Sequence, residues 1–281
     1  LARTFLFEVT KFTNIILKIM NKMKGVFIVF IVLQLLVLSC KKEEELEEAN
    51  FIHQEKKSDF LLPESKKGQV IDHNYYSLSY REEHEQAEWV AYWLNRKDVV
   101  SIHRKRPYFI NDPMIVSRSA SWKNYIRSGY DRGHLCPAGD RRFSKQAFEE
   151  TFYTSNVTPQ KKDFNAGIWN RLEQKVRYWA KKYNELYVVT GGVLSQKLNH
   201  IGKENVTVPN YFYKIVLNKR GDTYHGIAFL LPHEDSDRPL YEFVVSIDKI
   251  EQLTEIDFFP KLPDEIENRL ERNQSYREWR F

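Results

Sequence analysis

The stretch from Ala166 to Tyr183 constrains the fold more than any other part of the sequence. Its apolar residues recur at helical spacing and lie along one side of a single helix: Ile168, Leu172, Val176, Trp179 and Ala180. A helix with one apolar side packs that side against another layer of structure. We therefore expect a second layer beside this helix.

Runs rich in aromatic and β-branched residues predict the strands of that second layer. These runs cover residues 75–80, 186–190, 211–217, 225–231 and, more weakly, 244–247. Two further helices are predicted, one over 82–94, where acidic residues fill the first turn, and a shorter one over 145–152. Strands and helices do not alternate as regular βαβ units. The pattern favours an α+β fold with a mixed, largely antiparallel sheet flanked by helices.

An apolar run from Val26 to Ser39 precedes this folded part. A membrane-spanning helix needs roughly 20 such residues, whereas the apolar core of an export signal has roughly 7–15. Lys22 and Lys24 supply the positive charge that stands before such a core. Export is the better interpretation, and an uncleaved, slightly short membrane anchor is the alternative. Residues 1–19 could be upstream of the true start at Met20 or Met23, and we expect them to take no part in the fold.

The sequence Val37-Leu38-Ser39-Cys40 resembles the bacterial lipobox, in which the cysteine is lipidated and becomes the new N-terminus. An acidic run from Glu43 to Glu48 follows it, as expected for a solvated tether. We therefore expect a leader over 1–40, an acidic linker over 41–70 and a folded domain over 71–281. The protein is then an exported lipoprotein, anchored through Cys40 on the periplasmic or cell-surface face of a membrane.

Positive charge is concentrated within the folded part rather than spread over it. The whole chain has a formal charge of +5, yet residues 104–177 hold 15 basic and 7 acidic side chains. A local basic patch suits a polyphosphate ligand, because each contact releases counterions. A solvated basic surface is the alternative. Two cysteines exclude a disulfide-rich scaffold.

Two segments in this basic region carry recognisable motifs. SGYDRGHLCPAGD (Ser128–Asp140) contains DRGH, and TSNVTPQKKDFNAGIWNRLE (Thr154–Glu173) contains SN-x-TPQ followed by N-x-x-x-W-x-x-LE. In this order and spacing they resemble the DNA/RNA non-specific endonucleases, which belong to the ββα-metal or His-Me finger nucleases. Weaker similarity runs from Tyr75 to about Ile250. The resemblance implies a nuclease domain over 71–281 with a ββα-metal catalytic motif.

The resemblance also implies roles for single residues. His134 matches the general base of the family, and Asn165 matches its one direct protein ligand to a magnesium ion. Arg132 and Arg177 match arginines that meet the phosphate in the active site. Glu173 matches an acid that holds the waters of the metal.

Three further positions are matched less directly. Arg106 corresponds to another phosphate-binding arginine, with Arg104 as a neighbouring candidate. Asp131 matches the aspartate of the motif, which supports the site structurally. Cys136 stands where the family often has alanine, and a packing role is favoured over a reactive one.

The chemistry of these residue types agrees with the implied activity. A neutral histidine can take a proton from water, magnesium prefers oxygen ligands, and arginines fit phosphate oxygens. The resemblance thus implies metal-dependent, sequence-independent hydrolysis of DNA and RNA, with manganese or calcium as alternative metals. No obligate protein partner is implied, and a homodimer is left open. The alternative is a catalytically inactive surface lipoprotein that binds nucleic acid or a partner protein.

Overall fold

The computed structural model describes residues 60–64, 67–195 and 197–281. The expected leader, Cys40 and most of the expected linker lie outside the described residues. The folded part begins before residue 71, because Leu61 is buried in the core and the first strand starts at Gln69. None of the helices in the described ranges has the length and apolar character needed to cross a membrane.

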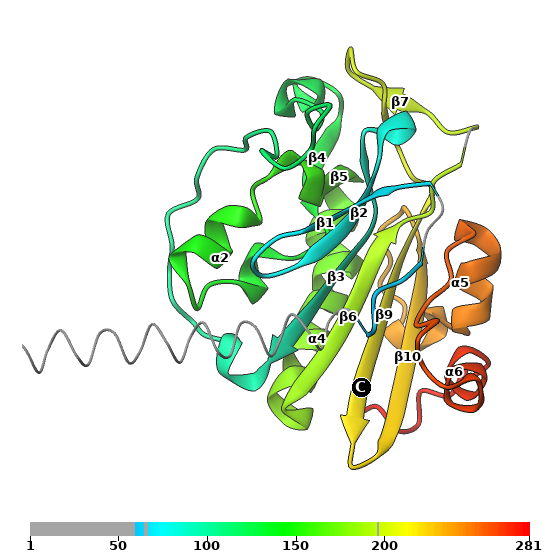
Figure 1. Ribbon diagram of the computed structural model, residues 1–281. Helices are drawn as coiled ribbons and strands as arrows, with labels where there is room; N and C mark the ends of the chain where they lie inside the picture. Colours follow the sequence, from blue (N-terminus) through cyan, green and yellow to red (C-terminus); the bar gives the residue numbers. More distant parts are fainter. Residues whose placement is uncertain (1–59, 65–66, 196) are drawn as a thin grey trace, which may run out of the picture. The chain divides into compact units, whose positions relative to one another are not determined.

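A seven-stranded sheet, antiparallel throughout, forms the centre of the fold (Figure 1). Its strands, in spatial order, are β1 (Gln69–Asp72), β2 (Ser77–Arg81), β3 (Gln86–Asn95), β6 (Glu185–Gly192), β9 (Tyr211–Arg220), β10 (Thr223–Pro232) and β11 (Val244–Val245). The runs at 186–190, 211–217 and 225–231 thus fall on strands, and the run at 75–80 falls on β2 except for its first two residues. The run at 244–247 divides between β11 and the start of a helix. The mixed α+β class and the largely antiparallel sheet are confirmed.

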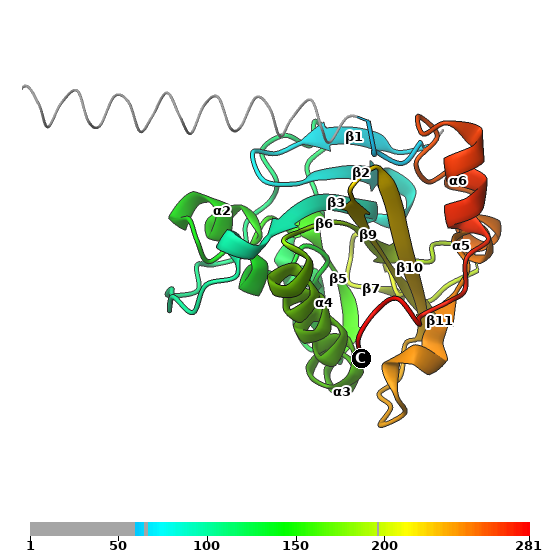
Figure 2. The same ribbon diagram turned by 90° about the horizontal axis from the view of Figure 1, so that it is seen from below.

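Helices cover both faces of this sheet (Figure 2). On one face lie α2 (Lys145–Glu150), α3 (Lys162–Phe164) and α4 (Asn170–Tyr183); on the other lie α5 (Ile247–Thr254) and α6 (Asp264–Glu271). Of the helix predicted over 166–183, residues 170–183 form α4, whose apolar side packs on the sheet through Leu172, Val176 and Trp179. The helix predicted over 145–152 is α2.

The helix predicted over 82–94 is wrong. A short 3-10 turn, Glu82–His84, leads directly into strand β3. Both faces of β3 are buried: Val90 and Tyr92 point into one core cluster, while Trp89 and Ala91 point into the other. A strand covered on both sides has a continuous apolar run instead of an alternating one, and such a run cannot be told from a buried helix by its period.

A separate two-stranded hairpin stands beside the sheet and leads into the long helix. Strand β4 (Tyr130–His134) pairs antiparallel with β5 (Val157–Lys161), and α3 follows at once. This is the expected ββα unit. A second small hairpin, β7 (His200–Ile201) with β8 (Val206–Thr207), lies near it.

Candidate active site

His134 ends strand β4, where it pairs in register with Val157. Side chains alternate along a strand, so His134 and Arg132 share one face of the hairpin and Asp131 points to the other. The His134 ring lies edge-on to Phe152, with centroids 5.0 Å apart, and tilted against Phe109 at 5.5 Å. Its Nε2 is buried and has no hydrogen-bond partner among the described residues.

Burial, reinforced by the charges of Arg106 and Arg132, lowers the pKa of His134 to about 3. The imidazole is therefore unprotonated at neutral pH. An unprotonated imidazole without a protein partner is able to accept a proton from a bound reactant.

The two arginines around His134 lie on the same aromatic side chains. The Arg132 guanidinium carbon is 4.9 Å from the Phe109 ring centroid, and that of Arg106 is 5.6 Å from the Phe152 centroid. Aromatic rings hold cations over their faces without neutralising them. Arg104, the neighbouring candidate, instead donates its guanidinium to backbone carbonyl groups. Arg106 is thus the arginine of this pair that acts electrostatically on His134.

The glycine of the DRGH motif, Gly133, is explained by a lack of space for a side chain at this position. A Cβ atom at Gly133 would lie 2.0 Å from the side-chain oxygen of Gln160 on the facing strand. Glycine therefore leaves room for the buried Gln160 side chain between Arg132 and His134.

Asn165 lies at the start of the helical segment that follows β5. Its Nδ2 donates a hydrogen bond of 3.1 Å to Oδ2 of Asp131, so the hairpin and the helix are joined at this point. The acceptor fixes which end of the amide faces Asp131, and this leaves Oδ1 turned away. Within the described ranges, no hydrogen bond engages that oxygen. An amide oxygen without a hydrogen-bond partner is a ligand of the kind that magnesium prefers, so Asn165 fits a metal-ligand role.

The helix is interrupted immediately after Asn165. Residues Asn165–Trp169 form a π-type turn in which Gly167 departs from helical geometry. The backbone N–H of Ile168 donates to Oδ1 of Asp235, 2.8 Å away, instead of to a helical carbonyl. A Cβ at Gly167 would lie only 2.0 Å from the same oxygen. The sequence did not reveal this interruption, although a glycine inside a helical pattern was its signal.

Glu173 and Arg177 lie further along α4, in a second charged group. Arg177 forms an ion pair of 2.7 Å with Asp140 and lies 3.7 Å from Glu173. Burial raises the pKa of Glu173 to about 7, while Arg177 and Lys214 act in the opposite direction. The carboxyl group of Glu173 therefore titrates near neutral pH, as functional carboxyl groups often do.

Sequence reasoning missed Lys214. This lysine is fully buried in the middle of β9, with Nζ 4.5 Å from the Trp169 ring centroid and 3.1 Å from Oγ1 of Thr190. Burial lowers its pKa to about 8, and the nearby carboxylates of Glu173 and Asp140 oppose that shift. The available signal was a single charge inside the apolar strand YFYKIVL.

Cys136 is fully buried, and burial raises the pKa of its thiol to about 12. A protonated, enclosed thiol is a poor nucleophile. The packing role is therefore the one that its surroundings support.

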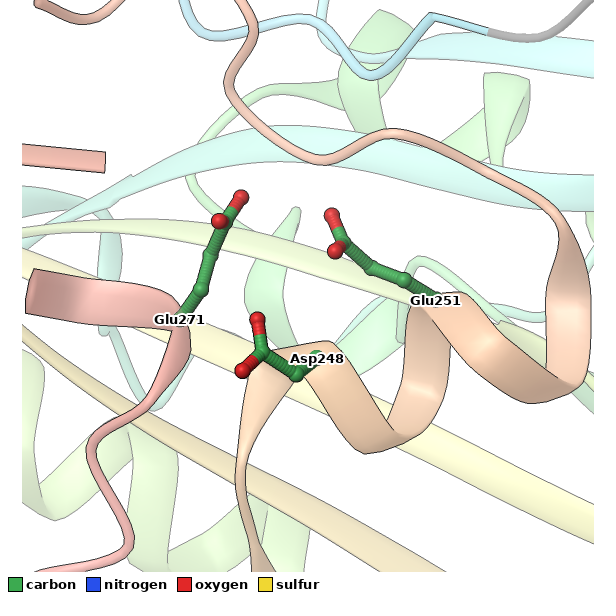
Figure 3. A group of neighbouring side chains, drawn as sticks. All are labelled: Asp248, Glu251 and Glu271. Carbon is green, nitrogen blue, oxygen red and sulfur yellow. The ribbon is translucent and has the colours of Figure 1, made fainter. Parts of the chain in front are cut away.

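Another cluster of carboxyl groups lies on the opposite face of the sheet. Asp248 and Glu251 extend from α5 toward Glu271 at the end of α6 (Figure 3). Glu251 and Glu271 share a hydrogen bond, and burial together with the neighbouring carboxylates raises the pKa of Glu271. The neighbouring charges that act most strongly on both pKa values are those of carboxylates.

An antiparallel hairpin that carries a histidine and leads into a helix opening with an asparagine defines the ββα class of nuclease folds. The sequence profile of the DNA/RNA non-specific endonucleases matches residues 58–265. The chain belongs to this family.

Its relatives include mitochondrial nuclease EXOG of Danio rerio, 34% identical over 220 residues, which are 72% of this chain and 64% of that protein. Nuclease C1 of Cunninghamella echinulata var. echinulata is 33% identical over 209 residues, 68% of this chain and 83% of that protein. The crystal structure of an EndoG/EndoGI complex superposes with a TM-score of 0.68 at 31% identity, covering 74% of this chain and 91% of that one. The chain thus spans less than two thirds of the length of the EXOG protein.

Proposed function

We propose that the protein is a metal-dependent endonuclease that hydrolyses phosphodiester bonds of DNA and RNA irrespective of sequence. The observation that carries this proposal is the buried His134 imidazole, whose Nε2 has no partner among the described residues, beside the cations of Arg106 and Arg132. Hydrolysis of a phosphodiester needs a base for the attacking water and positive charge for the phosphate. Family membership supports the same activity.

In this proposal the imidazole of His134 accepts a proton from the attacking water. Arg106 and Arg132 bind the phosphate oxygens and hold the phosphorus in front of His134. The bound phosphate neutralises these two cations, so it also removes part of the effect that lowers the pKa of His134. His134 is then a better base with substrate bound than without it.

The remaining site residues serve the metal and the phosphate. Asn165 would hold magnesium through Oδ1, and Glu173 would accept hydrogen bonds from the waters of the ion. When bound, the ion supplies charge neutralisation at the phosphate and at the departing 3′-oxygen. Manganese or calcium offers the same oxygen-seeking chemistry. Arg177 adds positive charge on the Glu173 side. These contacts are to the backbone of the nucleic acid and carry no sequence information.

The test is a gel containing DNA or RNA, developed with magnesium and with a chelator. We expect clearing with the metal and none with the chelator. His134→Ala should lower the initial rate by about 10²–10⁴-fold, whereas His225→Ala, at the far end of β10, serves as the matched control. Asn165→Ala should shift the magnesium titration to higher concentrations. A His134→Ala protein that cuts at the wild-type rate overturns the assignment of the base.

We further propose that the domain is exported and held on a membrane by a lipid on Cys40. The lipobox-like sequence around Cys40 supports this, together with the acidic tether that follows it. Cells that express the full chain should incorporate a labelled fatty acid into it, and nuclease activity should sediment with membranes. Cys40→Ser should lose the label and release the activity into the soluble fraction; retention of label in that variant contradicts the proposal.

A further inference from the structure

A groove with a volume of about 440 Å³ runs along the outer side of α4. Its polar and aromatic side chains are those of Ser101, Arg142, Gln174, Arg177, Tyr178 and Lys181. Arg177 belongs both to this groove and to the group formed with Glu173 and Asp140. Through Arg177, the groove borders the charged group of Glu173 and Asp140.

The charge of the groove is positive and only partly compensated. No carboxylate is among the residues that line it. The side chains of Arg142 and Lys181 make no hydrogen bond or ion pair with any described residue, whereas Arg177 is paired with Asp140. Two cations that line one groove and have no partner among the described residues suit a ligand with repeated negative charges.

Arg142 is presented by a rigid piece of backbone. The guanidinium of Arg104 donates to the carbonyl oxygens of Arg142, at 2.7 Å, and Phe143. On the inner side, Arg141 donates to the carbonyl oxygens of Tyr75 and Trp93. The backbone around Arg142 is thus held from both sides while its own side chain extends into solvent. Such an arrangement reduces the entropy lost when a ligand binds.

Tyr178 supplies an aromatic surface in the same groove. It is 45% exposed, on the same helix as Arg177 and Lys181. Lys175 lies over its ring at 5.0 Å, which adds a further positive charge beside the groove. Cations interleaved with an exposed aromatic ring are the composition of surfaces that bind single-stranded nucleic acid.

We propose that this α4 groove binds one strand of the nucleic acid on one side of the scissile phosphodiester. Successive phosphates contact Arg142 and Lys181, and an unpaired base stacks on Tyr178. This inference rests on the proposed function, since it extends the substrate beyond the bond that is cut. It makes single-stranded DNA or RNA the better-bound substrate.

The first test measures binding separately from cleavage. Fluorescence anisotropy of a labelled 12-nucleotide single strand is recorded in chelator at several salt concentrations. Each phosphate contact on a single strand contributes about 0.7 to the slope of log K against log salt. Arg142→Gln/Lys181→Gln should therefore lower that slope by about 1.4 relative to the wild type. Lys249→Gln, an exposed lysine on the opposite face of the sheet, is the matched control and should leave the slope unchanged.

The second test concerns the aromatic surface. Tyr178→Ala should weaken binding of the single strand by about 5- to 150-fold, the range expected for loss of one stacked base. A blunt duplex of equal length should lose less, because its bases are not free to stack. Equal losses for both substrates, or none, overturn the stacking role.

Failure of this inference and failure of the proposed function give different results. A wild type that cleaves DNA while the double variant keeps the wild-type salt slope overturns the groove alone. A wild type that binds with the expected slope and never cleaves overturns the nuclease activity alone. Absence of both binding and cleavage overturns both.

Discussion

Each face of the central sheet carries a carboxyl group whose pKa is raised, and the two groups differ in their neighbours. On the α4 face, burial raises the pKa of Glu173 to about 7, while Arg177 and Lys214 oppose the shift. On the α5/α6 face, burial and further carboxylates raise the pKa of Glu271 together. The cations thus keep the pKa of Glu173 near neutral pH. Glu271 instead retains its proton, which it shares with Glu251 in a hydrogen bond.

The comparison shows that a perturbed pKa does not by itself indicate a functional residue. A carboxyl group among cations ionises near neutral pH and can then serve a metal or a phosphate. A carboxyl group among carboxyl groups becomes a hydrogen-bond donor to its neighbours. The surrounding charges therefore distinguish the two sites better than the size of either shift.

The largest effect expected from this comparison is on catalysis. Glu173→Gln should lower kcat/KM on plasmid DNA by about 10–100-fold, as for other residues that orient the surroundings of a metal. Glu271→Gln on the opposite face should leave kcat/KM unchanged. Initial rates at saturating magnesium test both. Equal activities of the two variants would remove the distinction between the faces.

A smaller effect should follow from removing the buried cation. Without Lys214, the pKa of Glu173 rises further. When the pH is lowered, the Glu173 carboxylate therefore takes up its proton at a higher pH than in the wild type. The acidic limb of the pH profile of kcat/KM should therefore move upward by about one unit in Lys214→Met. Lys219→Met, exposed on the same strand, is the control. A profile that keeps its position while activity falls would mean that Lys214 serves only packing.

The smallest effect should appear in the pH dependence of the thermal stability of the protein, which the carboxyl cluster on the α5/α6 face influences. The pKa of Glu271 is raised in the folded state, so the unfolded chain releases this proton first as the pH rises. The contribution of Glu271 to stability is present at acidic pH and is lost as the pH rises through the raised pKa. Glu271→Gln should hence gain Tm relative to the wild type at alkaline pH, and the gain should shrink toward pH 4. Glu265→Gln, exposed on the same helix, should show no such trend.

The sequence allowed the long helix, most of the strands and the ββα unit to be predicted. Strong periodicity located the helix, and the DRGH and N-x-x-x-W motifs located the candidate residues without knowledge of their surroundings. Strand β3 was missed because a strand that is buried on both faces shows no alternation of apolar and polar residues. Lys214 was missed because its importance depends on Glu173 and Asp140, which reach it only through the tertiary fold.

The interruption of the helix at Gly167 limits how far the catalytic unit can be treated as a transferable module. The N–H of Ile168 that is freed there is satisfied by Asp235, 67 positions away in the chain and outside the hairpin and helix. Grafting residues 130–183 onto another scaffold would leave that amide without its acceptor. The segment could then form a regular α-helix, and this would change the direction of the Asn165 side chain. Within this protein, insertions between β10 and β11 should therefore be tolerated only where Asp235 keeps its place.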